Sequence, residues 1–375
     1  MTRLIFIAAV SSLLMGFGSK DQANSKAVKS QMHGLYNNLS IILPLYLKPF
    51  DFFEDSNKQK VKTQLSEIHV RSKKIQELLK SADEEHRILS KSLEHSADMA
   101  LASFDKGIKG QAKYFMGEML DTCMSCHTSR KSTKDSPFDL SRNVDIASLD
   151  GFSKAKLLTI SRRFKPAMDE YEKLLLKSQL SISDIIHFDP FLNYLVLGVR
   201  VRPDLDRVMA TLKKVADRPV PQSVKQDVKV WTKSLEDLQK KKWSKGTLLV
   251  QAKALMEKGK ELMDYPRDQS GAIYYLEASR RLKDFIGIKK VNSHDRALAY
   301  LLMGKSEMVL GRPFLGLEAR RYFETAIEMA PKTKMAKEAF RMYEEHVVFG
   351  YTGSSGLHLP DGEAEKLENL RKQAF

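Results

Sequence analysis

Residues 112–127 read AKYFMGEMLDTCMSCH, with Cys123, Cys126 and His127 at the end of the stretch. These two cysteines are the only cysteines of the chain. A Cys-x-x-Cys-His sequence is typical of covalent attachment of a c-type haem, in which both thiolates add to haem vinyl groups and the adjacent imidazole becomes an axial ligand of the iron. The sequence therefore predicts one covalently attached haem c, with His127 as the proximal ligand.

Two other kinds of site use paired cysteines. A dithiol redox pair usually sits at a strand-to-helix turn, and no strand pattern precedes Cys123. A structural zinc site needs about four ligands, and the chain offers neither a third cysteine nor a His-x-x-x-His pair to complete one. Haem attachment is the favoured interpretation, with the dithiol pair as the stronger of the two alternatives.

Residues 1–18 are expected to form an export signal. Arg3 precedes an apolar run from Leu4 to Phe17, and Gly16 and Gly18 provide small residues for cleavage. The run is too short and too weakly flanked for a membrane span, although an uncleaved anchor is the alternative. We therefore expect a periplasmic protein with no membrane span after cleavage. Bacteria attach c-type haem in an extracytoplasmic compartment, so this expectation agrees with the cysteine motif.

Apolar residues spaced by three and four predict four amphipathic helices in the first third of the chain. The first covers residues 27–47, and Pro44 should kink it or end it near Leu43. The second runs from a cap at 55–57 to about residue 81, the third starts near Asp83, and the fourth follows Gly107 and Gly110. Both cysteines continue the apolar face of the fourth helix: Ala112, Phe115, Met116, Met119, Leu120, Cys123 and Cys126. An attached haem would therefore face the interior of a helical bundle.

At this point the sequence resembles the cytochrome c′ family and its low-spin four-helix relatives. In that family a Cys-x-x-Cys-His lies late in the last helix and a basic residue follows, as Cys123, Cys126, His127 and Arg130 do here. The likeness covers about residues 25–131. It implies an antiparallel four-helix bundle in which the distal side of the haem faces the first helix.

The family resemblance raises the question of the sixth ligand of the iron. An apolar residue on the first helix would leave the iron five-coordinate, whereas a methionine would complete six. Met32 lies on the apolar stripe of that helix and is the candidate distal ligand, with core packing as the alternative role. His33 is a rival ligand, but it lies about 100° around the helix, off the apolar face. Met/His ligation suits electron transfer, and an open site suits small gases such as nitric oxide.

The second half of the chain predicts further helices with a degenerate repeat. In residues 299–331 small, aromatic and proline residues follow the order found in tetratricopeptide hairpins. Gly304 and Gly311 should let two helices approach closely, with Tyr322 and Phe323 filling the gaps. A coincidental array of helices is the alternative interpretation. Stacked hairpins of this type form surfaces that hold peptides or proteins.

These patterns together predict an all-α chain of several parts. We expect a signal peptide at 1–18, a four-helix c-type cytochrome domain at 19–135 and a polar linker at 136–152. A tetratricopeptide-like repeat domain at 153–349 and a glycine/serine loop with a final helix at 350–375 complete the chain.

The charge of the chain is strongly positive and unevenly placed. The 375 residues carry a formal net charge of +15, whereas residues 19–140 hold 19 Lys and Arg against 16 Asp and Glu. Most of the excess therefore lies in the second half. Export makes nucleic acid an unsuitable partner, so an acidic protein, an anionic lipid or an anionic wall polymer is expected instead. A cationic surface that only keeps the protein in solution is an equal alternative.

The function expected from the sequence is electron transfer by an exported monohaem cytochrome, whose repeat domain binds a redox partner protein. A gas-binding haem sensor or carrier is the second hypothesis, and a periplasmic adaptor with a structural haem is the third. No paired nucleophile and base, phosphate-binding glycine motif or carboxylate dyad indicates an enzyme. Four-helix haem proteins of this kind often pair, so a homodimer is a further expectation.

Overall fold

The computed structural model describes residues 6–47, 50–82, 84–128, 146–177, 185, 189–240, 246–265, 268–288, 290–311, 317–354, 356–359 and 361–375. The regular secondary structure of this part of the chain is helical apart from one short β pairing, so the all-α prediction is confirmed. The chain divides into two compact units. Unit 1 comprises residues 1–123 and 140–145, and unit 2 comprises residues 124–139 and 146–375. The domain boundaries expected from composition stay predictions.

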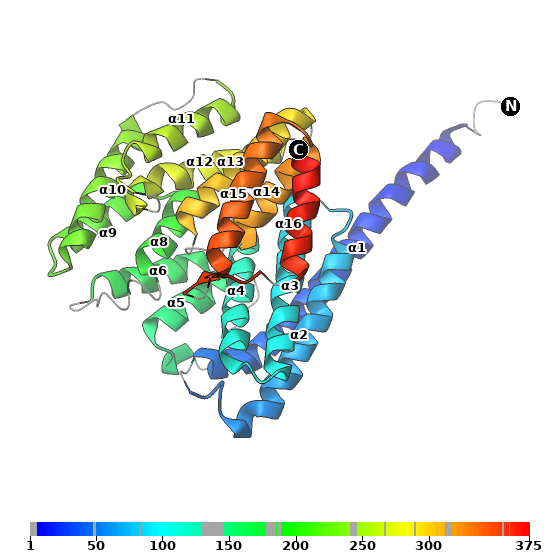
Figure 1. Cartoon of the computed structure of the whole chain (residues 1–375), viewed down its shortest axis with the longest axis horizontal. Helices are drawn as coiled ribbons and strands as arrows, with labels where there is room; N and C mark the ends of the chain where they lie inside the picture. The colour runs from blue at the N-terminus through cyan, green and yellow to red at the C-terminus, as the bar shows by residue number, and fades with distance from the viewer. Residues whose placement is uncertain are drawn as a thin grey trace. The chain divides into compact units, whose positions relative to one another are not determined.

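Unit 1 is built from three helices and most of a fourth, labelled in Figure 1. They are α1 (Phe6–Leu47), α2 (Lys58–Leu78), α3 (Glu84–Asp105) and α4 (Lys109–Thr128), with the short 3-10 helix η1 (Asp55–Asn57) before α2. The predicted apolar stripes are buried, including Leu35, Leu39 and Ile42 of α1, Val61, Leu65 and Ile68 of α2, Ile88 and Phe104 of α3, and Met116 and Leu120 of α4. Each helix therefore buries one face, as the spacing of three and four requires.

The first helix differs from its prediction at both ends. It is already helical at Phe6, so the residues expected as an export signal and the first bundle helix belong to one element. It also continues through Pro44 to Leu47, so it does not end near Leu43, and the alternative of a kink at Pro44 stays a prediction. Pro44 lies in the last turn, where the loss of a single N–H donor interrupts few backbone hydrogen bonds. Within the described residues, no helix has both the length and the apolar character needed to cross a bilayer.

The connections α1–α2 and α3–α4 lie at the same end of unit 1. Lys109 Nζ, in the first turn of α4, donates hydrogen bonds to the Phe53 carbonyl oxygen at 2.6 Å and to Asp55 Oδ1 at 3.0 Å. One turn later the ammonium of Lys113 lies 5.3 Å from the centre of the Phe53 ring. Because α1 leads into the first connection and α4 leaves the second, α1 and α4 run antiparallel.

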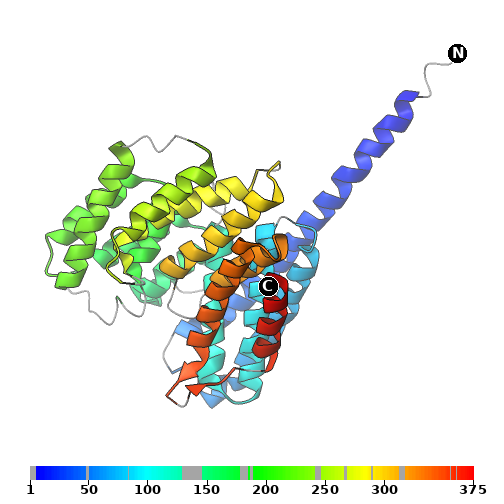
Figure 2. The same cartoon turned by 45° about the horizontal axis from the view of Figure 1, so that its top comes forward.

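Unit 2 is a series of short helices, many of which pair with their neighbours in the chain (Figures 1 and 2). They are α5 (Gly151–Ile160), α6 (Phe164–Leu175), α8 (Pro190–Leu195), α9 (Leu205–Ala216), α10 (Gln222–Lys240), α11 (Leu248–Lys260), α12 (Ala272–Ile286), α13 (Ser293–Leu310), α14 (Leu317–Met329), α15 (Lys334–Tyr351) and α16 (Asp361–Ala374). A π-helical turn, η4 (Val196–Val201), follows α8, and 3-10 turns cover Ile146–Ser148 (η3) and Gln269–Gly271 (η5).

The glycine/serine stretch after α15 contains the β pairing. Strand β1 (Thr352–Gly353) pairs antiparallel with β2 (Gly356–Leu357). Beyond it, the His358 N–H donates to the Tyr351 carbonyl at 3.1 Å. The stretch predicted as a loop is therefore partly a small hairpin.

The α13–α14 hairpin packs closely at Gly304, as predicted for that residue, whereas a Cβ atom at Gly311 would meet the Glu307 carbonyl of α13 itself. A Cβ atom added to Gly304 would lie 2.5 Å from the ring of Phe323, so the glycine is what lets the two helices approach. Phe323 itself is fully buried. Tyr300 and Tyr322 stack beside this contact with ring centres 6.2 Å apart. The hairpin is thus a close-packed helix pair centred on Gly304.

We predict that Gly304→Ala destabilises the protein by about 1–3 kcal/mol, because the new methyl group must displace a ring in a filled core. Chemical denaturation monitored by circular dichroism measures the change. Gly362→Ala in α16 is the matched control, since a Cβ at Gly362 meets nothing within 4 Å. Equal stability of the two variants would contradict the close contact at Gly304.

Two aspartates lie close together where α10 meets the segment before α12. Asp268 is 7 % exposed and its carboxylate accepts hydrogen bonds from Ser270 N and Ser270 Oγ at 2.9 and 2.7 Å. These bonds stabilise the ionised form, and the pKa of Asp268 is lowered despite its burial. Burial, followed by the negative charge of Asp268, raises the pKa of Asp227 to about 6. The folded protein therefore holds a proton on Asp227 at pH values where the unfolded chain has lost it.

We predict that Asp227→Asn raises the free energy of unfolding at pH 7 by about 1–2 kcal/mol. The gain should shrink as the pH falls from about 6 to about 4, because wild-type Asp227 then becomes protonated and uncharged. Urea unfolding at several pH values measures it. Asp217→Asn, at an exposed position between α9 and α10, is the control and should change little at any pH. A gain for Asp227→Asn that is the same at pH 4 and pH 7 would be inconsistent with the raised pKa.

Candidate functional site

The predicted attachment residues lie in the last two turns of α4. Cys123 and Cys126 are three positions apart in a continuous helix, so their side chains project from the same side. Both are half-buried. One to two turns earlier, Met116, Met119 and Leu120 of the same face are fully buried. The cysteines thus extend the apolar face of α4, as the sequence predicted.

His127 makes a specific contact with the helix α5 of unit 2. Its Nδ1 lies 2.5 Å from the carbonyl oxygen of Ile160, the last residue of α5. The last four carbonyl groups of an α-helix have no donor within the helix, and the Nδ1–H of His127 supplies one to Ile160. This bond selects the tautomer with the proton on Nδ1. The other ring nitrogen, Nε2, then carries a lone pair that can bind a metal.

The imidazole of His127 is held neutral. Its pKa is lowered to about 4: burial is the largest cause, the hydrogen bond to Ile160 partly opposes it, and the charge of Arg162 adds to the lowering. A histidine must be uncharged to act as a metal ligand. At neutral pH His127 therefore has both properties of a preorganised ligand, a neutral ring and a fixed tautomer.

The helix that supplies the Ile160 carbonyl is capped at both ends. The Asp150 carboxylate accepts from the N–H groups of Phe152 and Ser153 at 2.9 and 3.0 Å, which is an N-cap. At the other end, Arg163 N–H donates to the Leu158 carbonyl and Arg162 N–H to the Thr159 carbonyl, both at 2.9 Å. This pair of bonds is a Schellman motif, in which the residue with positive φ is usually glycine. Here that residue is Arg162, with φ of 59°.

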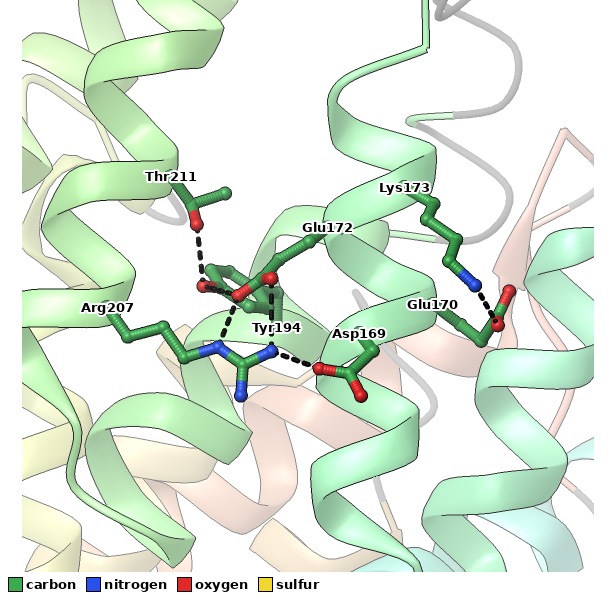
Figure 3. A network of polar contacts seen from close by, with 7 residues as sticks. All are labelled: Asp169, Glu170, Glu172, Lys173, Tyr194, Arg207 and Thr211. Carbon is green, nitrogen blue, oxygen red and sulfur yellow. Dashed lines mark hydrogen bonds and ion pairs between the residues drawn. The ribbon is translucent and has the colours of Figure 1, made fainter.

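Helix α6 follows this turn and is tied to its neighbours by ion pairs. Lys154 of α5 lies 3.0 Å from Glu170 of α6. Figure 3 shows a second connection, in which Arg207 of α9 reaches α6 and donates to both carboxylate oxygens of Glu172 at 2.6 and 3.0 Å. The buried Tyr194 of α8 donates to the same carboxylate at 2.7 Å. These contacts hold α6, and with it the turn after Ile160, in place.

The structure supports no specific role for the other predicted site residues, Met32, His33 and Arg130. Met32 is half-buried on α1, and His33 beside it is exposed, in line with its predicted position off the apolar face. Met32 belongs to unit 1 and His127 to unit 2, so their pairing across one iron stays a prediction. Arg130, the basic residue of the family resemblance, lies outside the described residues.

Two residues of the site were not predicted from the sequence. Ile160 acts through its backbone oxygen, for which an isoleucine gives no signal. Arg162 lies at a position where glycine would have marked the helix end, so its role was also hidden.

Within the described residues, no three His, Cys, Asp or Glu side chains gather as a metal-ion site. A haem iron needs only axial ligands from the protein, so the relevant feature here is a single preorganised imidazole. No protein family, curated protein or solved structure matches this chain.

We predict that His127 stays neutral, with its proton on Nδ1, down to about pH 4 in the protein without an attached cofactor. Its ordinary pKa would be about 6.5. Nitrogen-15 NMR of the histidine rings reports both charge and tautomer, and the spectrum of His127→Gln assigns the signal. A ring that becomes charged near pH 6.5, or one with its proton on Nε2, would contradict the contact with Ile160.

Proposed function

We propose that the protein is an exported monohaem c-type cytochrome that transfers electrons, with the haem attached through Cys123 and Cys126 and ligated by His127. The observation that carries the proposal is the hydrogen bond from His127 Nδ1 to the Ile160 carbonyl. Histidines that bind metals almost always donate their second ring nitrogen to a carbonyl or carboxylate. A histidine directly after Cys-x-x-Cys that has this arrangement is suited to be the proximal ligand.

In this proposal the cysteines of α4 would attach the cofactor covalently, and His127 would bind its iron. Each cysteine thiol would add across a vinyl group, its sulfur bonding one carbon and its proton ending on the other. His127 would present Nε2 to the iron, while Ile160 fixes the ring and makes the imidazole a better electron donor. A bound haem supplies a one-electron iron couple. Because both cysteines are half-buried and continue the apolar face of α4, a haem attached to them would lie against that face.

The proposal for the distal side concerns Met32. A thioether ligand would raise the reduction potential and favour electron transfer, whereas an open position would favour gas binding. Unit 1 offers Met32 half-buried in α1, one turn before the fully buried Leu35. We therefore propose that unit 1 is an antiparallel bundle of cytochrome c′ type. We propose in addition that Met32 is the distal ligand.

Unit 2 is proposed to bind a partner protein. Its paired helices, such as the close-packed α13–α14, support a repeat-like array of tetratricopeptide type. Most of the positive charge of the chain lies in this half, which suits an acidic redox partner in the periplasm.

We predict that the full chain, exported in a host that matures c-type cytochromes, carries one covalent haem. Pyridine haemochrome spectra and intact mass measure it. The double variant Cys123→Ala/Cys126→Ala should carry none, and Ser125→Ala, between the cysteines, should match the wild type. His127→Ala should lose the low-spin spectrum of the reduced protein. A correctly exported protein without covalent haem would overturn the proposal.

Met32→Ala separates electron transfer from the gas-binding alternative. If Met32 is the distal ligand, the variant should bind carbon monoxide much faster than the wild type and lose the sulfur-to-iron charge-transfer band. Met99→Ala is the matched control, because Met99 is also a half-buried helical methionine. Fast carbon monoxide binding by the wild type would instead favour the gas-binding function.

A further inference from the structure

Arg162 is the residue at which three features coincide beside His127. It adopts φ of 59°, a left-handed conformation that is unfavourable for a non-glycine residue. Its Nε is buried and has no hydrogen-bond partner in the part of the chain that the structure describes. Its charge also reaches the ring of His127, whose pKa it lowers. Glycine at this position would relieve the backbone strain and would remove the buried donor. The arginine is therefore unfavourable here in two ways, through its φ angle and through its unpaired Nε.

Strain and an unsatisfied buried donor often mark a functional residue. All three non-glycine residues with positive φ in the described part of the chain have a local structural role, which for Arg162 is the Schellman motif after α5. The side chain of Asp189 accepts from Leu192 N–H, and the N–H of Lys332 donates to the Gln373 carbonyl. Arg162 differs because its guanidinium lies half-buried next to a proposed iron ligand, with an N–H donor aimed at no described acceptor.

A guanidinium pairs best with a carboxylate, to which it can donate two parallel hydrogen bonds. No carboxylate of the described residues lies within ion-pair distance of Arg162. A haem ligated by His127 would carry two propionate carboxylates, which are acceptors of the kind that this guanidinium lacks. A haem propionate, which the proposed function implies, therefore has the charge and the chemistry of the acceptor that Arg162 lacks.

We propose that Arg162 binds a haem propionate and raises the reduction potential of the iron. This inference rests on the proposed function, because the propionate belongs to the attached haem. A fixed positive charge near the iron disfavours the ferric state, which has one more positive charge than the ferrous state. The same guanidinium would neutralise the propionate, whose negative charge has the opposite effect. The positive charge beside the haem would then be that of Arg162, at the end of α5. Arg162 lies outside residues 25–131, which resemble the cytochrome c′ family.

The test compares Arg162→Asn with Lys332→Asn in the full-length, haem-loaded protein. Asparagine tolerates positive φ, so both variants should keep the fold. Each variant removes one positive charge from a residue with the same φ of 59° after a helix, but only Arg162 lies near His127. We expect the midpoint potential of Arg162→Asn to be more negative than that of the wild type, and that of Lys332→Asn to be unchanged. The propionate bending band in the resonance Raman spectrum should shift in Arg162→Asn alone.

Arg162→Lys provides the second arm, since it keeps the charge but loses the two-pronged donor. It should restore much of the potential and leave the Raman band shifted. Haem content measured on the same samples separates the two proposals. A wild-type protein without covalent haem would overturn the proposed function and this inference with it. Full haem content with equal potentials and equal Raman bands in Arg162→Asn and Lys332→Asn would overturn the inference alone.

Discussion

The hydrogen bond between His127 and the Ile160 carbonyl is the interaction on which the candidate site depends. An imidazole alone can hold its proton on either nitrogen and can become charged near neutral pH. Here burial keeps the ring neutral, and a helix-terminal carbonyl chooses the nitrogen that carries the proton. The bond also satisfies an acceptor that α5 cannot satisfy itself. One contact therefore both fixes the orientation of the imidazole and satisfies the end of α5.

The sequence was a good guide wherever packing follows local periodicity. Leu35, Ile68 and Met116 are buried as their spacing predicted, and Gly304 packs against Phe323 as a small residue in a helix hairpin should. Proline was a weaker guide, because Pro44 lies close enough to the end of α1 for the helix to continue past it. Periodicity predicts which face of a helix is buried. It predicts less well where the helix ends, since each terminus depends on one or two residues.

The partner of His127 could not have been predicted in the same way. Ile160 is 33 residues away, and it contributes a backbone atom that every residue type possesses. Arg162 was hidden for a related reason. Glycine is the usual signal of a Schellman motif, and an arginine there looks like an ordinary residue of a basic segment. The cysteine motif predicted the type of chemistry, whereas the supporting atoms became visible only in three dimensions.

A ligand held by a backbone carbonyl has a consequence for how such a site can be tuned. No side-chain substitution removes the Ile160 oxygen, so its position can change only through the ends of α5. One end is fixed by the Asp150 cap and the other by the left-handed Arg162, with the Lys154–Glu170 ion pair joining α5 to α6. Because the carbonyl that contacts His127 and the proposed propionate partner, Arg162, both lie at the C-terminal end of α5, a shift of that end would affect both together. The electronic properties of the iron and the packing of α5 in unit 2 would then be linked through a single turn of backbone.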